Sequence, residues 1–412
     1  MTAELEARIL LAQEIERGAS VLSSRVVEAF LNVPRHPFVP AFYRRDGAKH
    51  VPTRGHNHEW LQAVYADDVL VTEVDGVHAE DAPDGGVVGD ATSSSTAPGL
   101  MAEMLDALDV RPGDRVWEIG TGTGYNAALL CHLAGAGNVT TVDRTARLVD
   151  VARERLREVG FEPAVLRADG AGAPPPGGPF DRIVATCAVR RVPRSWLEQC
   201  VTGGVIIVPI GDALGGGAVV RLTKLPDGGA AGRVRAPPPA RNAPPPGGGT
   251  AGTRRPAPGK GTRPGGGAGG RFLHRPAAFM PLRADGSTAA TGLPAQVTGR
   301  RRASVVGARV LDDHAFSFWA GLCLPRTVLR GGGTLHDPAD GSTVRVDDHP
   351  GRPSTVTASG PRDLWQVVES AWNGWRRHHR PRREWLTLTV RADGTQAVGF
   401  TAPDGGTTAW LL

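Results

Sequence analysis

The pattern of hydrophobic and polar positions changes along the chain, and its first segment, residues 1–95, is typical of helices followed by irregular structure. Apolar side chains recur at helical spacing within residues 10–15 and again within residues 26–31. The prolines of residues 32–40 forbid continuation of the second helix, and the Gly/Asp-rich residues 75–91 predict a loop. We expect this segment to form a helical lid beside a substrate site.

Residues 96–227 alternate between strand-like and helix-like runs. The expected strands cover 114–120, 138–143, 163–169, 180–187 and 203–211. The expected helices cover 99–108, 125–135, 146–160 and 193–200. Strands separated by helices of this length predict a parallel sheet with right-handed crossovers, the Rossmann-like α/β class.

Residues 228–271 are Gly, Pro, Ala and Arg with almost no large apolar residue, so they cannot bury enough surface to offset their ordering entropy. They carry eight Lys and Arg and no acid, so the net charge of +5 belongs to this segment and the rest of the chain stands at −3. We expect a disordered insertion in a surface hairpin, because strand-like residues 217–225 precede it and 270–283 follow it.

The final segment, residues 272–412, holds six of the nine tryptophans and predicts an α+β extension. Residues 361–378 predict an amphipathic helix, and residues 384–400 predict a hairpin that turns at 392–394. This domain is our candidate for recognising a peptide through its tryptophans, although core packing is the simpler interpretation for any single one.

Several classes of protein are disfavoured by what the sequence lacks. The first twenty residues have neither the basic nor the apolar region of a secretory signal, and no run of 18 apolar residues exists, so we expect a cytoplasmic protein without a membrane partner. The four cysteines form no CxxC pair, and His36, His132 and His274 have no ligand spacing, so no metal site is expected.

The strongest local motif is ExGxGxG at residues 118–124, between an expected strand and an expected helix. It matches neither the dinucleotide fingerprint GxGxxG nor the phosphate loop, which needs a lysine that this loop lacks. An acidic residue here would repel a pyrophosphate. Glu118 suits a ligand that carries a cation, such as the amino group in the methionine portion of S-adenosylmethionine.

Two further carboxylates lie where the next two strands end. Asp143 can accept hydrogen bonds from both ribose hydroxyls, and Asp169, followed by Gly170, can accept from an adenine amino group. Because the carboxyl ends of parallel strands share one edge of the sheet, we expect all three acidic residues at one ligand site. A plain tight turn at the glycines is the simpler alternative.

These motifs resemble the protein-L-isoaspartate O-methyltransferases over residues 92–212. The matching text includes TAPGLMAEML, VWEIGTGTGYNAALL, VTTVD, LRADG and GGVIIVPIG, and VPRHPFVPAFY upstream is similar to the family's N-terminal segment. The flanks WLQAVYADDVLVTE, ATSSSTAP, FWAGLCLP and GPRDLWQVVESAW resemble the methyltransferases of ATP-grasp peptide maturase systems, which act on ribosomally made, crosslinked peptides.

The resemblance implies a Rossmann-like methyltransferase that uses S-adenosylmethionine to methylate a carboxylate. The expected cofactor-binding residues are Glu118, Gly120, Thr121, Gly122, Gly124, Tyr125, Asp143, Arg144, Asp169 and Gly170. The family has a Ser-x-Pro motif whose hydroxyl lies near the acceptor, and the aligned residue here is Thr96. Because Thr96 is a departure, Ser95 and Ser94 stay candidate catalytic residues, and an N-cap role for this polar run is the alternative.

The expected acceptor is an aspartate side chain in an acidic precursor peptide crosslinked by an ATP-grasp ligase, whose methyl ester closes to an aspartimide and then gives isoaspartate. The alternatives are repair of isoaspartate in damaged proteins, a nucleic-acid-binding protein or methyltransferase that uses the basic insertion, and a fold that binds the donor without catalysis. Nucleic acid is disfavoured because the arginines of 228–271 lack interleaved aromatics.

Overall fold

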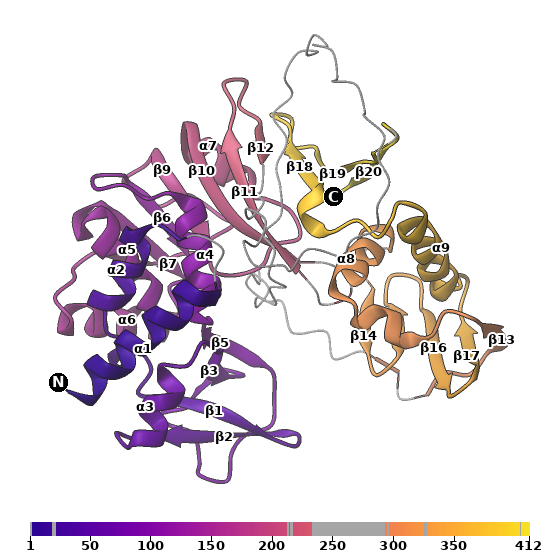
Figure 1. The fold of residues 1–412 in the computed structure, drawn as a ribbon, viewed down its shortest axis with the longest axis horizontal. Helices are drawn as coiled ribbons and strands as arrows, with labels where there is room; N and C mark the ends of the chain where they lie inside the picture. The colour runs from indigo at the N-terminus through magenta and orange to yellow at the C-terminus, as the bar shows by residue number, and fades with distance from the viewer. Residues whose placement is uncertain are drawn as a thin grey trace, which may run out of the picture.

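The computed structural model describes residues 2–18, 22–211, 214, 217–232, 293–294, 296–324, 328–403 and 405–412. Figure 1 shows three sheets with helices packed around them. Most of the insertion expected at 228–271, and the strand expected after it at 270–283, lie outside the described residues.

The N-terminal segment forms helices, as expected, but also a sheet that the sequence pattern does not predict. The helices are α1 (Ala3–Gly18), α2 (Ser24–Asn32), η1 (His36–Phe38) and α3 (His58–Val64). The five strands are β1 (Ala41–Asp46), β2 (Lys49–Arg54), β3 (Leu70–Val74), β4 (Val77–His78) and β5 (Ala91–Ser95). The expectation of irregular structure was therefore wrong, because polar strands such as β5 show no apolar alternation.

The central sheet contains the parallel strands that the sequence predicts. These are β6 (Val116–Ile119), β7 (Val139–Asp143), β8 (Ala164–Arg167), β9 (Phe180–Ala185) and β10 (Cys200–Gly211). The connecting helices are α4 (Pro98–Leu108), α5 (Tyr125–Ala134), η2 (Ala136–Asn138), α6 (Ala146–Glu158) and α7 (Arg194–Gln199). The strand order of β10-β9-β6-β7-β8 changes direction at β6, which is where ligands bind in open α/β sheets.

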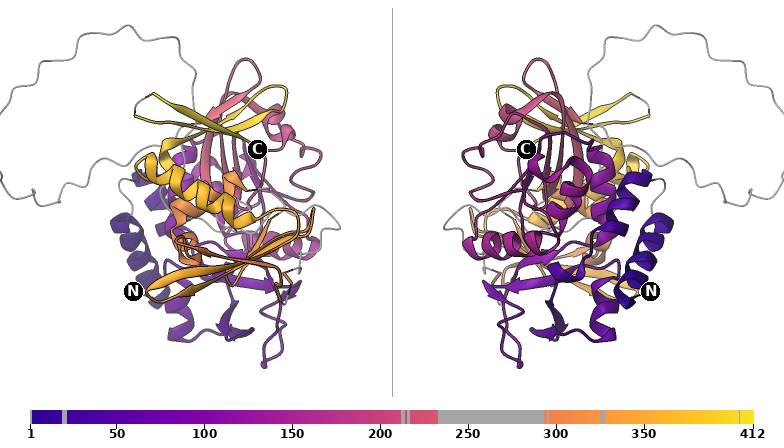
Figure 2. Two further views of the ribbon diagram at one scale, coloured as in Figure 1. Left: turned by 90° about the vertical axis from the view of Figure 1, so that its right-hand side faces the viewer. Right: turned by 90° about the vertical axis from the view of Figure 1, so that its left-hand side faces the viewer.

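This sheet does not end with the parallel strands. Antiparallel strands follow in the order β11 (Gly217–Lys224), β12 (Ala230–Gly232), β18 (Leu386–Val390), β19 (Gln396–Thr401) and β20 (Thr407–Leu411). Residues 386–411 therefore continue the sheet of the core, although the sequence places them in a separate extension (Figure 2). The expected hairpin at 384–400 is confirmed.

The remainder of the C-terminal segment forms a third sheet with its own helices. Its sheet has the order β13 (Arg300–Ser304), β17 (Arg352–Ser359), β16 (Ser342–His349), β15 (Thr334–Asp337) and β14 (Leu329–Gly331). The helices are η3 (Ala308–Asp312), α8 (His314–Cys323), α9 (Leu364–Arg377) and η4 (Arg383–Trp385). The expected helix at 361–378 is thus confirmed.

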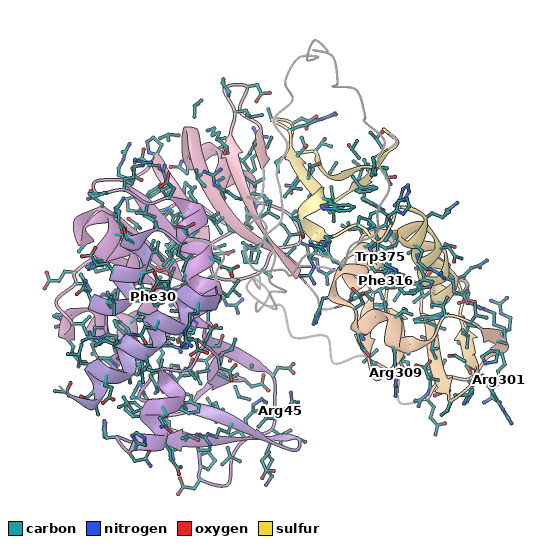
Figure 3. All side chains as sticks on the ribbon, in the orientation of Figure 1. Phe30, Arg45, Arg301, Arg309, Phe316 and Trp375 are labelled. Carbon is teal, nitrogen blue, oxygen red and sulfur yellow. The ribbon has the colours of Figure 1, made fainter. Side chains whose placement is uncertain are left out.

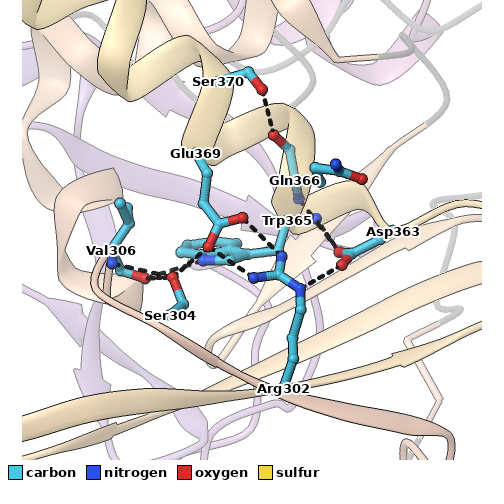
Figure 4. Close-up of polar contacts among 8 residues, drawn as sticks. All are labelled: Arg302, Ser304, Val306, Asp363, Trp365, Gln366, Glu369 and Ser370. Atoms are coloured by element: carbon cyan, nitrogen blue, oxygen red, sulfur yellow. Dashed lines mark hydrogen bonds and ion pairs between the residues drawn. The ribbon is translucent and has the colours of Figure 1, made fainter.

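An ion-pair network fixes α9 to the edge strand of this sheet (Figure 4). Arg302 on β13 donates to both carboxylate oxygens of Glu369 at 2.8 Å and to Asp363 at 2.7 Å. Asp363 also caps α9 by accepting from Trp365 N at 3.0 Å. A two-pronged arginine contact of this kind is more directional than a single charge pair.

Most of the C-terminal tryptophans belong to the core. Trp365 and Trp375 are 1% and 3% exposed, and Figure 3 places Trp375 with Phe316 where α8 meets α9. The rings of Phe316 and Trp375 lie 5.5 Å apart between centroids. Among the described residues, Trp385 is the one large aromatic residue that is exposed, at 45% of its surface.

Candidate functional site

The glycine loop that follows β6 has the backbone shape that its sequence predicts. Gly120 and Gly124 adopt φ of 99° and 90°, in the left-handed region that favours glycine. A Cβ at position 120 would lie 2.5 Å from Thr186 Oγ1, and one at 124 would lie 3.2 Å from Ala152. The loop therefore needs glycine both for its conformation and for its close packing.

A cavity of about 520 Å³ opens beside this loop, at the carboxyl ends of β6, β7 and β8. Nearly all of the predicted site residues line it: Ser94, Ser95, Thr96, Gly120, Thr121, Gly122, Tyr125, Asp143, Arg144, Asp169 and Gly170. Its other wall comes from β3 and β5 of the N-terminal sheet. The sequence thus brings the expected donor and acceptor residues to one cavity, while Glu118 and Gly124 are absent from its lining.

Asp143 organises the loop as well as lining the cavity. Its Oδ2 accepts from Gly122 N at 3.0 Å, and its Oδ1 accepts from Thr145 N at 3.1 Å. Burial raises the pKa of this carboxyl, and the backbone N–H donors partly oppose the shift. The carboxylate is held rigidly at the end of β7, where lone pairs not used by the backbone can accept from ligand hydroxyls.

Asp169 and Gly170 occupy the same edge after β8. Asp169 Oδ1 accepts from Ala171 N at 2.9 Å, and the Gly170 carbonyl accepts from Trp196 Nε1 at 2.6 Å. Trp196 is fully buried, so this hydrogen bond anchors the backbone of the turn to the protein core. Both residues line the cavity, as the sequence predicts.

Glu118 does not reach the cavity, which corrects the expectation that it contacts the ligand directly. It is 0% exposed, and its carboxylate accepts from Asn126 Nδ2 at 2.7 Å and from Thr141 Oγ1 at 2.6 Å. Burial raises the pKa of Glu118 to about 7. The side chain turns under the loop because these two donors, on α5 and β7, satisfy it there.

Asn126 takes the place in the cavity that the sequence gives to Glu118. Asn126 lines the cavity, and its Nδ2 donates to Glu118. The other amide atom of Asn126, Oδ1, is buried and has no hydrogen-bond partner among the described residues. The hydroxyl of Tyr125 is buried and unpartnered in the same sense. Buried polar atoms without partners are costly, so the Asn126 oxygen fits a ligand that supplies a donor.

The hydroxyl groups before α4 separate into two faces of β5. Ser95 Oγ accepts from Arg35 Nε and Nη2 at 3.2 and 3.1 Å, so this hydroxyl is already engaged although Ser95 borders the cavity. Ser94 and Thr96 are partly exposed and line the cavity. The structure therefore favours Thr96 and Ser94 over Ser95 as the hydroxyls that meet an acceptor.

The alternative N-cap role for this polar run was wrong. The N-cap residue of α4 is Ala97, and its side chain forms no cap bond. Asp67 Oδ1, from the segment before β3, accepts from Gly99 N at 2.6 Å instead. The hydroxyls of Ser94 and Thr96 are thus not needed to begin the helix.

Two functional candidates escape the sequence analysis. Arg35 is 0% exposed and also donates to carbonyls of Val64, Ala66, Asp68 and Thr96. Burial lowers its pKa to about 10, so it is charged at neutral pH. Glu73 on β3 lines the cavity at 4% exposure. Arg35 lies within the quoted VPRHPFVPAFY, whereas Glu73 has no motif that marks it.

The donor expected from the sequence fits these residues. S-adenosylmethionine carries an amine that can donate a hydrogen bond to Asn126 Oδ1. Its ribose hydroxyls can donate to Asp143, and its adenine amino group can donate to Asp169. Among the described residues no group of three or more His, Cys, Asp or Glu could hold a metal ion. None of the described helices combines the length and apolar character that crossing a membrane requires.

Comparison with known proteins agrees with this geometry. A family model described as protein-L-isoaspartate(D-aspartate) O-methyltransferase matches residues 58–234. The protein-L-isoaspartate O-methyltransferase of Ignicoccus hospitalis is 39% identical over 140 residues, 34% of this chain and 66% of that protein. The protein of the same name from Methanopyrus kandleri is 35% identical over 209 residues, 50% of this chain and 77% of that protein.

A solved structure of a protein-L-isoaspartate O-methyltransferase has the same fold over most of the length. The TM-score is 0.50 at 21% identity, and the alignment covers 95% of this chain and 99% of that one. The likeness therefore extends over the C-terminal segment as well as the core.

Proposed function

Because the chain belongs to the protein-L-isoaspartate O-methyltransferase family, we propose that it methylates the free carboxylate of isoaspartyl residues in proteins or peptides. The chain is an S-adenosylmethionine-dependent carboxyl O-methyltransferase. The observation that supports the acceptor is that Thr96 and Ser94 line the same cavity as Asp143 and Asn126. Candidate acceptor hydroxyls and candidate donor-binding residues thus share one cavity.

The reaction requires little acid–base catalysis from the protein. When bound, S-adenosylmethionine supplies the methyl group that passes from its sulfonium to a carboxylate oxygen. A carboxylate is already a nucleophile at neutral pH, so the hydroxyls of Thr96 and Ser94 need only orient it. Holding the two reactants in line can lower the barrier by about 7–11 kcal/mol.

Exclusion of water supports the same step. The charges of carboxylate and sulfonium cancel during transfer, so a partly dry cavity favours the reaction. Leu100 and Met101 on α4 and Ile119 and Val142 on the sheet give the cavity apolar walls. Arg35 keeps the backbone of Thr96 in place by donating to its carbonyl at 3.1 Å.

The test is transfer of a labelled methyl group to a pair of synthetic peptides that differ only in isoaspartate or aspartate at one position. We expect ester formation on the isoaspartyl peptide alone, and about a 10–100-fold loss of kcat/KM in Thr96→Val. Equal labelling of both peptides, or of neither, would contradict the proposal. Binding of S-adenosylhomocysteine by the variant shows that the donor site is intact.

An acidic precursor peptide crosslinked by an ATP-grasp ligase is the second candidate acceptor, methylated on an aspartate side chain. Arg376 and Arg377 at the end of α9, and Arg380 and Arg382 just after it, are exposed, and residues 376–382 contain no acidic residue, which suits an acidic peptide. Thr96 in place of the family's serine also favours a distinct acceptor. Methylation of a crosslinked precursor, but not of isoaspartyl peptides, would select this candidate.

A further inference from the structure

A buried carboxylate that the proposed reaction does not use lies in the wall of the cavity. Glu73 is on β3, where its backbone pairs with Ser93 of β5, and it lines the cavity together with Ser94 and Thr96. The side chain is 4% exposed. A carboxylate so close to the path of an anionic acceptor needs a reason, since like charges repel.

Polar contacts keep Glu73 ionised. Its Oε1 accepts from Thr92 Oγ1 at 2.6 Å, and its Oε2 lies 2.9 Å from His78 Nε2. Burial acts to raise the pKa of Glu73, but the contacts with His78 and Thr92 outweigh it and leave the pKa below its usual value. A carboxylate has about four acceptor positions, so these two partners leave capacity for a donor in the cavity.

The alternation of β5 places Glu73 at one end of a row of hydroxyls. Ser93 and Ser95 are buried and contact Thr72 and Arg35. All five residues from Thr92 to Thr96 border the cavity, but the alternate residues Thr92, Ser94 and Thr96 are the partly exposed ones. Four residues of strand span about 13 Å, so the row runs that far from Thr96 to the contact with Glu73.

An extended acceptor peptide can lie along this row. With its reacting carboxylate at Thr96, a group within about four residues of the methylated one comes to Glu73. A lysine or arginine there gains a buried charge partner, and a glutamate meets a like charge that the neighbouring Asp143 reinforces. Arg147 lies near enough to act on Glu73, but His78 is its direct partner.

We propose that Glu73 is a specificity-determining residue that binds a cationic side chain of the acceptor within about four residues of the methylated carboxylate. This inference rests on the proposed function, because it takes the acceptor to be a peptide. It adds a preference that a bare isoaspartyl recognition site would not have.

The test uses isoaspartyl peptides that carry Lys, Gln or Glu at one position, scanned from one to four residues on each side. For the wild-type enzyme we expect kcat/KM to be about tenfold higher with Lys than with Glu at one or more positions. Glu73→Gln should reduce this ratio to about twofold or less while the affinity for S-adenosylhomocysteine is unchanged. Glu73→Asp keeps the charge and should retain part of the preference, which also protects the test if Glu73→Gln does not fold.

Asp84→Asn is the matched control, because Asp84 is an exposed carboxylate in the N-terminal segment that pairs with Arg54 and does not line the cavity. It should keep the wild-type ratio. An equal ratio at every position in the wild type, or a loss of S-adenosylhomocysteine binding in Glu73→Gln, would overturn this inference alone. Failure of the wild type to methylate any peptide would overturn the proposed function, and this inference with it.

Discussion

The hydroxyl of Ser95 is bound by the guanidinium of Arg35, which donates to it from Nε at 3.2 Å and from Nη2 at 3.1 Å. This contact joins the segment after α2 to the strand that leads into the cavity. It also assigns adjacent hydroxyls to different tasks, because Ser95 is buried with its hydroxyl on Arg35, whereas Thr96 is partly exposed in the cavity wall.

Substitution of the two hydroxyls should therefore have opposite effects. Ser95→Ala should lower the free energy of unfolding by about 1–2 kcal/mol with little change in kcat/KM for the isoaspartyl peptide, because it removes buried hydrogen bonds. Thr96→Val should lower kcat/KM and leave unfolding in urea nearly unchanged. A large catalytic loss in Ser95→Ala with unchanged stability would show that Ser95 is the working hydroxyl after all.

Asn126 and Glu118 should differ in how they affect donor affinity. Asn126→Ala removes the unpartnered Oδ1 from the cavity and should weaken binding of S-adenosylhomocysteine, measured by calorimetry, by about 10–100-fold. Glu118→Gln keeps a side chain that can bind Asn126, so it should weaken the binding of S-adenosylhomocysteine less. If Glu118→Gln were the more damaging variant, the direct contact expected from the sequence would be restored.

The buried Glu118 should make stability depend on pH. Its pKa is about 7 in the folded chain against 4.5 for an ordinary glutamate, so the folded state binds this proton more tightly than the unfolded state. The resulting stabilisation is complete below pH 4.5 and is lost as the pH rises through 7. Between pH 5 and 8, wild type should lose about 2.5 kcal/mol of unfolding free energy relative to Glu118→Gln in urea unfolding. Parallel curves for the two proteins would contradict a raised pKa.

The contact between the C-terminal hairpin and the core should be important for stability. Gln396 on β19 is 4% exposed and pairs with the backbone of Val192, accepting from its N–H at 2.9 Å and donating to its carbonyl at 2.7 Å. Gln396→Leu leaves both backbone groups without these partners and should cost about 2–4 kcal/mol. Thr395→Ala, on the turn beside Gln396, is the control. Equal thermal stability of the two variants would show that the contact between Gln396 and Val192 does not stabilise the fold.

The sequence predicts the central sheet and the cavity well because local signals determine them. Short apolar runs such as residues 205–208 predict buried strands, and Gly120 and Gly124 occupy positions where side chains do not fit. Strand β5 escapes prediction because ATSSS carries no apolar alternation, and its place is set by pairing with β3 and by Arg35.

Side-chain direction is the part of the site that the sequence does not determine. The motif places Glu118 at the correct edge of the sheet, but Asn126 and Thr141, eight and 23 residues away, decide that it turns beneath the loop. Glu73 could not be found because its partners, His78 and Thr92, come together only through the pairing of β3 with β4 and β5.

The shared ten-stranded sheet has a consequence for anyone who wishes to shorten this enzyme. Removing the residues after Gly232 would strip β18 from the side of β12 and leave a row of backbone donors and acceptors open to other chains. Such a bare edge is a template for self-association. A minimal catalytic fragment would therefore have to bring its own cover for that edge, and cutting the gene where the family match ends would yield an insoluble product.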